Sequence, residues 1–147
     1  MDKQSILDEI NRLIAERLER LQRELDDLKS GLASNTKSTA GDKHETSRAM
    51  AHNEQERLAV QLDQTLHQKR MAAGIDASTT HTKVEYGSLV KTDRGTFFFS
   101  LGLGKIAIGS ETIFCIAANT PMGQALLGKS TGENAQMNGI VNILEVC

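Results

Sequence analysis

The chain has 147 residues, enough for one ordinary domain or two small ones, and its formal net charge at pH 7 is −2. This balance gives no sign of general binding to nucleic acid or to membrane surfaces. The first residues lack the basic and apolar regions of a signal peptide, and no apolar run approaches the length of a membrane span. We therefore expect neither export nor membrane insertion, and a cytoplasmic location.

The composition changes sharply near Gly74. Before it the chain is rich in Glu, Arg, Leu and Gln, whereas after it Gly, Thr, Val, Ile and Phe dominate. A linker rich in Gly, Ser and Thr at 74–82 separates the two parts. We expect one domain over residues 1–75 and another over 83–147. The two cysteines show no metal-ligand spacing, and both are expected to be reduced thiols.

Residues 4–33 have the apolar periodicity of one long helix. Asn11 interrupts this seam and is a candidate for fixing its register. The helix also carries Glu-before-Arg pairs four residues apart, which stabilise an exposed face. These pairs are Glu16 with Arg20 and Glu19 with Arg23. The seam consists of Leu7, Ile14, Leu18, Leu21, Leu25, Leu28 and Leu32.

A polar segment at 34–41 has turn composition and ends the first helix. A second helix is predicted from Asp42 or Glu45 to Ala73, with a thinner apolar stripe. The two helices would form an antiparallel hairpin about 45 Å long. We expect a monomer if the leucine seam is satisfied within the hairpin. A dimerising coiled coil is the alternative, because leucines left exposed on the second helix would favour self-association. The stripe consists of Met50, Leu58, Leu62 and Leu66.

The second half reads as short strands separated by glycines and polar turns. Thr120 and Pro121 start a short helix that Gly128 ends. Asn138 and Gly139 predict a tight hairpin turn near the carboxyl end. The sequence therefore predicts an α+β fold, with the helical hairpin followed by a small antiparallel sheet that carries one short helix. The predicted strands cover 84–90, 96–101, 105–108, 112–116, 134–137 and 140–146.

Gly41, Asp42 and Glu45 lie at the tip of the predicted hairpin. Two carboxylates three residues apart are a candidate for binding a metal. The same spacing fits the start of a helix, where acidic side chains satisfy free N–H groups and suit the helix dipole. The local sequence by itself favours helix capping, and it leaves metal binding open.

Three stretches resemble the Gre transcript-cleavage factors of bacterial RNA polymerase. Residues 120–133 read Thr-Pro-Met-Gly-Gln-Ala-Leu-Leu-Gly-Lys-Ser-Thr-Gly-Glu, which is similar without gaps to that family's signature near its carboxyl end. Residues 84–90 are similar to the family's first strand, and 41–46 fall where the family carries an acidic tip. The resemblance is strongest over 84–133 and at the tip, and it is weakest along the helices.

This resemblance implies a protein that docks at the secondary channel of bacterial RNA polymerase through its globular domain, which in this family is FKBP-like. The hairpin would then bring Asp42 and Glu45 to the polymerase's active centre. There they would help to hold Mg²⁺ and stimulate the polymerase's own cleavage of backtracked RNA, near the RNA 3′ end. The protein would be an accessory factor with no cofactor of its own and no enzymatic activity by itself.

The chain departs from the family pattern near the tip. Thr46 replaces the usual Asn, and residues 47–50 lack the usual aromatic side chain. These departures leave open a regulator of the same fold that does not stimulate cleavage, or a coiled-coil interaction protein. Lys43 and Arg48 are candidates for contacting RNA, and simple solvation of both charges is the alternative.

Four residues of the second half are candidates for docking to the polymerase. We expect at least one phenylalanine of 97–99 to remain on the outer face of its strand and contribute to docking. The four candidates are Phe97, Phe99, Pro121 and Lys129.

Overall fold

The computed structural model describes the backbone of residues 2–35 and 42–147, and the side chains of all of these except 32–35 and 42–44. The contacts between residues divide the chain into two compact units. One unit is helical and comprises residues 11–70, whereas the other comprises residues 1–10 and 71–147 and contains the sheet. The first ten residues thus group with the sheet, a division different from the predicted domains 1–75 and 83–147.

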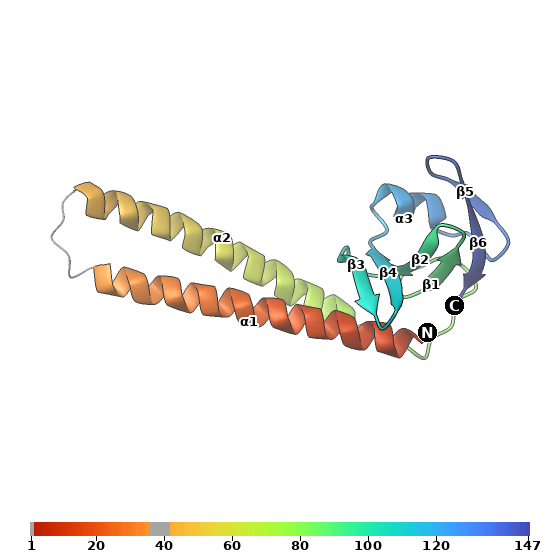
Figure 1. Cartoon of the computed structure of the whole chain (residues 1–147), viewed down its shortest axis with the longest axis horizontal. Coiled ribbons are helices and arrows are strands. Elements are labelled where there is room, and N and C mark those ends of the chain that lie inside the picture. The colour runs from red at the N-terminus through yellow and green to blue at the C-terminus, as the bar shows by residue number, and fades with distance from the viewer. Residues whose placement is uncertain (1, 36–41) are drawn as a thin grey trace. The chain divides into compact units, whose positions relative to one another are not determined.

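The helical unit is an antiparallel pair formed by α1 (Lys3–Asn35) and α2 (Asp42–Ala73) (Figure 1). Its apolar centre consists of Leu21 and Leu25 from α1 and Leu58 from α2, with Leu28 and Leu62 packed against them. Asn11 is exposed, so the expectation that it interrupts the seam is wrong. Its neighbour Ile10 is fully buried, and it belongs to the unit that contains the sheet.

Local side-chain interactions explain why α1 begins at Lys3 and continues. The backbone N–H of Ser5 donates to Asp2 Oδ1 at 2.7 Å, which caps the first turn. This bond to Ser5 also lowers the pKa of the Asp2 carboxyl. Arg23 pairs with Glu19 at 2.8 Å as predicted, whereas Glu16 pairs with Arg12 at 2.6 Å instead of Arg20.

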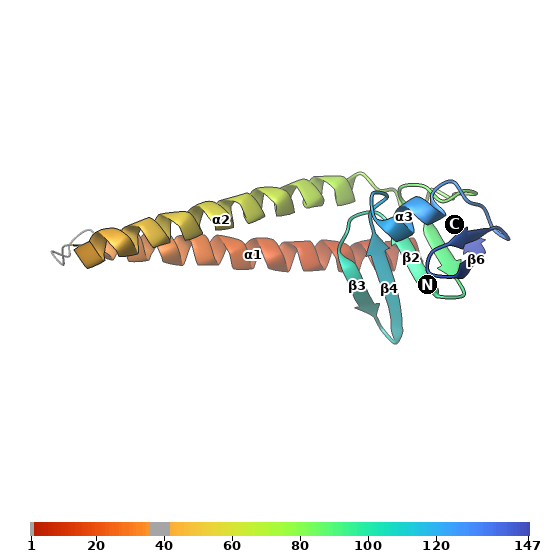
Figure 2. The same cartoon turned by 90° about the horizontal axis from the view of Figure 1, so that it is seen from above.

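The second unit contains a six-stranded sheet in the order β3-β4-β2-β1-β6-β5 (Figure 1), and Figure 2 shows β3 and β4 side by side at one edge. The predicted fold class is confirmed, with one correction to the sheet. Most neighbouring strands pair antiparallel, but β2 and β4 are parallel. After β2 the chain forms β3 at the edge of the sheet, and it then returns as β4, which lies between β3 and β2. The strands are β1 (Leu89–Thr92), β2 (Gly95–Phe99), β3 (Gly104–Ile108), β4 (Glu111–Ile116), β5 (Asn134–Gln136) and β6 (Ile140–Val146).

The first strand begins five residues later than predicted. Val84 bonds instead to the segment after α3 (Pro121–Leu126), because its N–H donates to the Lys129 carbonyl and its carbonyl accepts from Gly128. A turn then intervenes, with Gly87 at φ +90°. A left-handed backbone of this kind is available to glycine at little cost.

The predicted short helix and terminal hairpin are both present. The Thr120 hydroxyl accepts the Gly123 N–H at 3.1 Å, and Pro121 occupies the first turn of α3. Asn138 and Gly139 have φ values of 51° and 107°. Three residues, 137–139, connect the paired Gln136 and Ile140, and two of them adopt positive φ.

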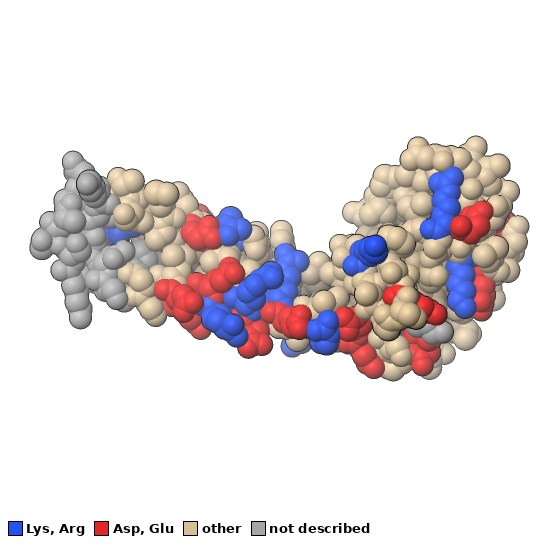
Figure 3. Space-filling view, in the orientation of Figure 1, with Lys and Arg blue, Asp and Glu red and all other residues tan. Residues whose placement is uncertain are grey.

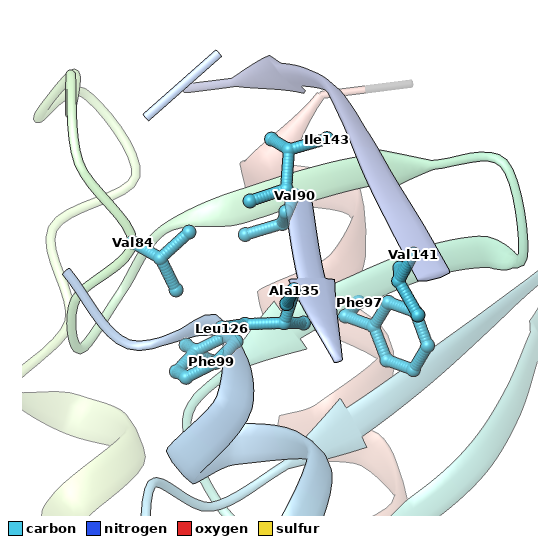
Figure 4. Close-up of a cluster of buried hydrophobic side chains, with 8 residues drawn as sticks. All are labelled: Val84, Val90, Phe97, Phe99, Leu126, Ala135, Val141 and Ile143. Carbon is cyan, nitrogen blue, oxygen red and sulfur yellow. The ribbon is translucent and has the colours of Figure 1, made fainter. Parts of the chain in front are cut away.

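The core of the sheet unit lies between the sheet and α3 (Figure 4). Phe97 and Phe99 from β2 and Leu126 from α3 are the large side chains at its centre, all less than 9% exposed. Burying an aromatic ring of this size contributes about 2–3 kcal/mol relative to leaving it exposed. The buried cluster consists of Val84, Val90, Phe97, Phe99, Leu126, Ala135, Val141 and Ile143.

The opposite face of the sheet is buried as well. Phe98 of β2 and Ile113 of β4 are 0% and 1% exposed. The first turns of α1 belong to the same unit, and their Ile6 and Ile10 are fully buried. Among the described helices, none is long and apolar enough to cross a membrane.

Candidate functional site

The candidate site is the amino-terminal end of α2. Asp42 is the first residue of α2 and Glu45 completes its first turn. Residues three apart on a helix lie on the same face, so the backbone places these two positions together. Residues 36–41 lie outside the described part of the chain, and so does the side chain of Asp42.

The Glu45 side chain is exposed, so a cation in solvent can reach its carboxylate. It also lies within the first turn, where the helix dipole favours negative charge. Helix capping and metal binding therefore remain compatible with the placement of Asp42 and Glu45. Because Mg²⁺ takes about six oxygen ligands, two carboxylates by themselves do not complete its coordination.

The two candidate RNA contacts lie close to this acidic pair in sequence. Arg48 is exposed on α2, one turn after Glu45. The side chain of Lys43 lies outside the described residues. In Figure 3 basic and acidic side chains are interspersed over the helices, so the visible face carries no extended surface of one sign.

The docking candidates divide into buried and accessible residues. Phe97 and Phe99 point into the core (Figure 4), with 7% and 1% of their surfaces exposed. The expectation that one phenylalanine of 97–99 lies on an outer face is wrong, because both faces of β2 are covered. Pro121 is exposed at the start of α3, and Lys129 is partly exposed just after it.

Sequence reasoning missed a contact between the β1–β2 turn and the hairpin formed by β5 and β6. Asp93, in the turn between β1 and β2, accepts the backbone and side-chain N–H groups of Asn142 at 2.9 and 2.8 Å. These bonds lower the pKa of the Asp93 carboxyl. Its neighbour Arg94 donates to the carbonyls of Met137 and Asn138. The separation of about 45 residues hides this contact from any local pattern.

A small cavity of about 160 Å³ lies beside the segment that follows α2. The His81 imidazole lines it, and its Nδ1 lies 2.6 Å from Glu85 Oε1. A Cβ atom at Gly87 would lie 3.5 Å from His81 Nε2, so the ring packs closely on this turn. The remaining lining residues are Gly74, Ile75, Asp76, Thr79 and Tyr86.

No cluster of three or more His, Cys, Asp or Glu side chains arranged to hold a metal occurs among the described residues. Both cysteines are free, as expected. Burial raises the pKa of the Cys115 thiol to about 12, which keeps it protonated and unreactive at neutral pH.

Comparison with known proteins gives a structural likeness at low sequence identity. No protein-family model matches the chain, and no curated protein matches it. A solved structure entitled "Structure of the transcription factor Gfh1" is similar over 92% of this chain and 92% of that chain, at 17% sequence identity and a TM-score of 0.39.

Proposed function

We propose that this chain is a transcription factor of the Gre type that binds bacterial RNA polymerase at its secondary channel and stimulates the polymerase's cleavage of backtracked RNA. The observation that carries the proposal is the position of Asp42 and Glu45 in the first turn of α2, at the loop end of a long helix pair. The gap-free resemblance over 120–133 supports the same family. Cleavage would occur in the cytoplasm and belong to the polymerase.

The length of the helix pair suits such a role. A helix of 33 residues is about 50 Å long, and α1 and α2 have 33 and 32 residues. A pair this long buries only a narrow seam, so it contributes little core volume. Its physical advantage is that it can carry two carboxylates to a site that a compact domain cannot enter.

The carboxylates would act by ligating a cation that the polymerase also holds. A bound Mg²⁺ supplies charge neutralisation at phosphate and lowers the pKa of a coordinated water. Asp42 and Glu45 would add oxygen ligands from one helix face, and their helical spacing would keep them together. Arg48, one turn further on, is available to contact an RNA phosphate.

The decisive experiment measures RNA cleavage in a stalled, backtracked elongation complex. We expect Asp42→Asn/Glu45→Gln to abolish stimulation while leaving polymerase binding unchanged. Asparagine still caps helices well, so this pair of substitutions removes carboxylates without removing a possible cap. Glu56→Gln/Asp63→Asn is the matched control, because both of its residues are exposed on α2 away from the tip.

Two results would contradict the proposal. Cleavage that persists in the Asp42→Asn/Glu45→Gln variant would reduce the carboxylates to helix caps. Binding to polymerase without cleavage by the unmodified protein would favour a regulator of the same fold. That second function is suggested by Thr46, which stands where the family pattern has Asn, and by the missing aromatic residue in 47–50.

A further inference from the structure

Burial decreases along the helical unit toward the carboxyl end of α1 and the amino-terminal end of α2. Leu21, Leu25 and Leu58 are 1%, 5% and 2% exposed. Closer to the loop, none of the side chains in residues 26–31 of α1 and 45–57 of α2 is buried. We name these two segments the distal arms.

The residues that face across the distal arms are poorly suited to hold them together. Leu28 is the partly buried residue of the α1 arm, and the partly buried residues of the α2 arm are Ala51, Glu54 and Gln55. Alanine offers little apolar area, and the other two carry polar groups. Glu54 pairs with Arg57 on its own helix, so this ion pair does not join the arms.

Other features of the arms point the same way. Met50, the large apolar side chain of the α2 arm, is 68% exposed and adds nothing to the seam. A Cβ atom at Gly31 would meet nothing within 4 Å, so no close packing requires glycine in this helix. Glycine within a helix lowers its stability relative to alanine because the unfolded chain has more freedom.

Isolated helical segments of 6 and 13 residues are marginal in water, so their stability must come from packing. Leu28 of the α1 arm packs against the leucine cluster, but no side chain of the distal arms is buried, whereas Leu21, Leu25 and Leu58 of the cluster are. Proteins open locally where few apolar contacts hold the backbone, at a free energy below that of global unfolding. The hydrogen bonds of the arms are therefore expected to break while those around Leu21 and Leu58 remain.

We propose that the distal arms form a separate opening unit of the free protein and close when a partner surface encloses them. The first half rests on burial alone. The second half rests on the proposed function, because an enclosing channel would supply the lateral contacts that the arms lack. The cost of ordering the arms would then weaken binding and make it reversible.

Hydrogen exchange of the full chain, followed by mass spectrometry, tests the first half. We expect backbone amides of 45–57 to exchange at least about 100-fold faster than those around Leu58. Equal protection of the two segments would overturn the proposal. The measurement needs no partner and no assumption about function.

A pair of matched variants tests whether missing packing is the cause. Ala51→Leu/Gln55→Leu places leucine at two partly buried positions of the arm and should slow its exchange about tenfold or more. Ala49→Leu/Asn53→Leu places leucine at two exposed positions of the same helix, with the same spacing. This control should slow exchange less than about threefold, since it adds only helix propensity. Similar slowing by both variants would contradict a role for packing.

The cleavage assay tests closure by the partner. Ala51→Leu/Gln55→Leu should reach half-maximal cleavage at a lower concentration than Ala49→Leu/Asn53→Leu, because its arms are closed beforehand. Equal concentrations would overturn the second half of the proposal. Fast exchange of the arms together with no stimulated cleavage would reject the proposed function and leave the opening unit standing.

Discussion

The sheet unit and the distal arms differ in how their apolar side chains are used. In the sheet unit, apolar residues from both faces of β2 are buried, and strands distant in sequence are joined side by side. In the arms, successive turns meet a single neighbouring helix and bury no side chain among the described residues. Regular secondary structure therefore does not by itself indicate how strongly two elements are packed together. A helix can have all of its backbone hydrogen bonds and still bury little apolar surface against the neighbouring helix.

The largest expected effect is the loss of a core ring. Phe99→Ala should lower the free energy of unfolding by about 3–5 kcal/mol, because it removes a side chain that is 1% exposed and leaves a cavity. Chemical denaturation with a spectroscopic probe of the sheet unit measures this loss. A decrease below about 1 kcal/mol would mean that the core is much looser than its burial indicates.

A methyl group added inside the sheet unit should also destabilise the folded protein. A Cβ atom at Gly123 would lie 2.3 Å from the Ala117 carbonyl oxygen, a backbone atom that cannot move aside freely. Gly123→Ala should therefore lower the free energy of unfolding by about 1–3 kcal/mol. An unchanged denaturation midpoint would show that α3 can shift away from the strand ends.

The same substitution in the distal arms should have the opposite sign. Gly31 lies within α1 and has open space around its Cα. Gly31→Ala should stabilise the helix by about 0.5–1 kcal/mol, because alanine loses less conformational freedom on folding. Slower hydrogen exchange of residues 26–31 checks this result. Faster exchange would contradict the placement of Gly31 in unstrained helix.

A smaller effect on stability is expected from pH, through the contact of the β1–β2 turn with β6. The bonds from Asn142 lower the pKa of Asp93, so its contribution to stability is present above the ordinary carboxyl pKa near 4 and is lost as pH falls through the lowered value. Asp93→Asn should therefore be less stable than the unmodified protein at about pH 6, and the difference should shrink by about pH 2. Denaturation midpoints across this range measure it.

The control for this pH prediction is Asp63→Asn, which changes an exposed carboxylate of the helical unit. It should not show the pH-dependent difference expected of Asp93→Asn. An equal response of the two variants would mean that general charge, and not the bonds to Asn142, produces the effect.

Local patterns predicted much of this molecule. The apolar period of 4–33 predicted a helix that extends over Lys3–Asn35, and Thr120-Pro121 and Asn138-Gly139 predicted the short helix and the tight turn. These features depend on residues a few positions apart, whose propensities and hydrogen bonds act within one element. For the candidate site, the sequence placed the acidic pair at the start of the second helix.

The errors occurred where distant segments meet. The alternation of β2 suggested that one phenylalanine of 97–99 is exposed, but coverage of both sheet faces buries all three. Val84 was expected within a strand, but it pairs with the segment after α3. The residues that cover β2 and the segment that pairs with Val84 are both distant in sequence, so no local pattern could identify these contacts.

The sequence by itself determined the helices, the type of most strands, the turns and the position of Asp42 and Glu45 along the chain, because local periodicity and turn chemistry decide these. Only the tertiary structure decided the parallel pairing of β2 with β4, the burial of both sheet faces and the lack of packing in the distal arms. Those properties depend on which segments pack against each other. The free energy of burial depends on the apolar area removed from water, and that area is set by segments far apart in sequence.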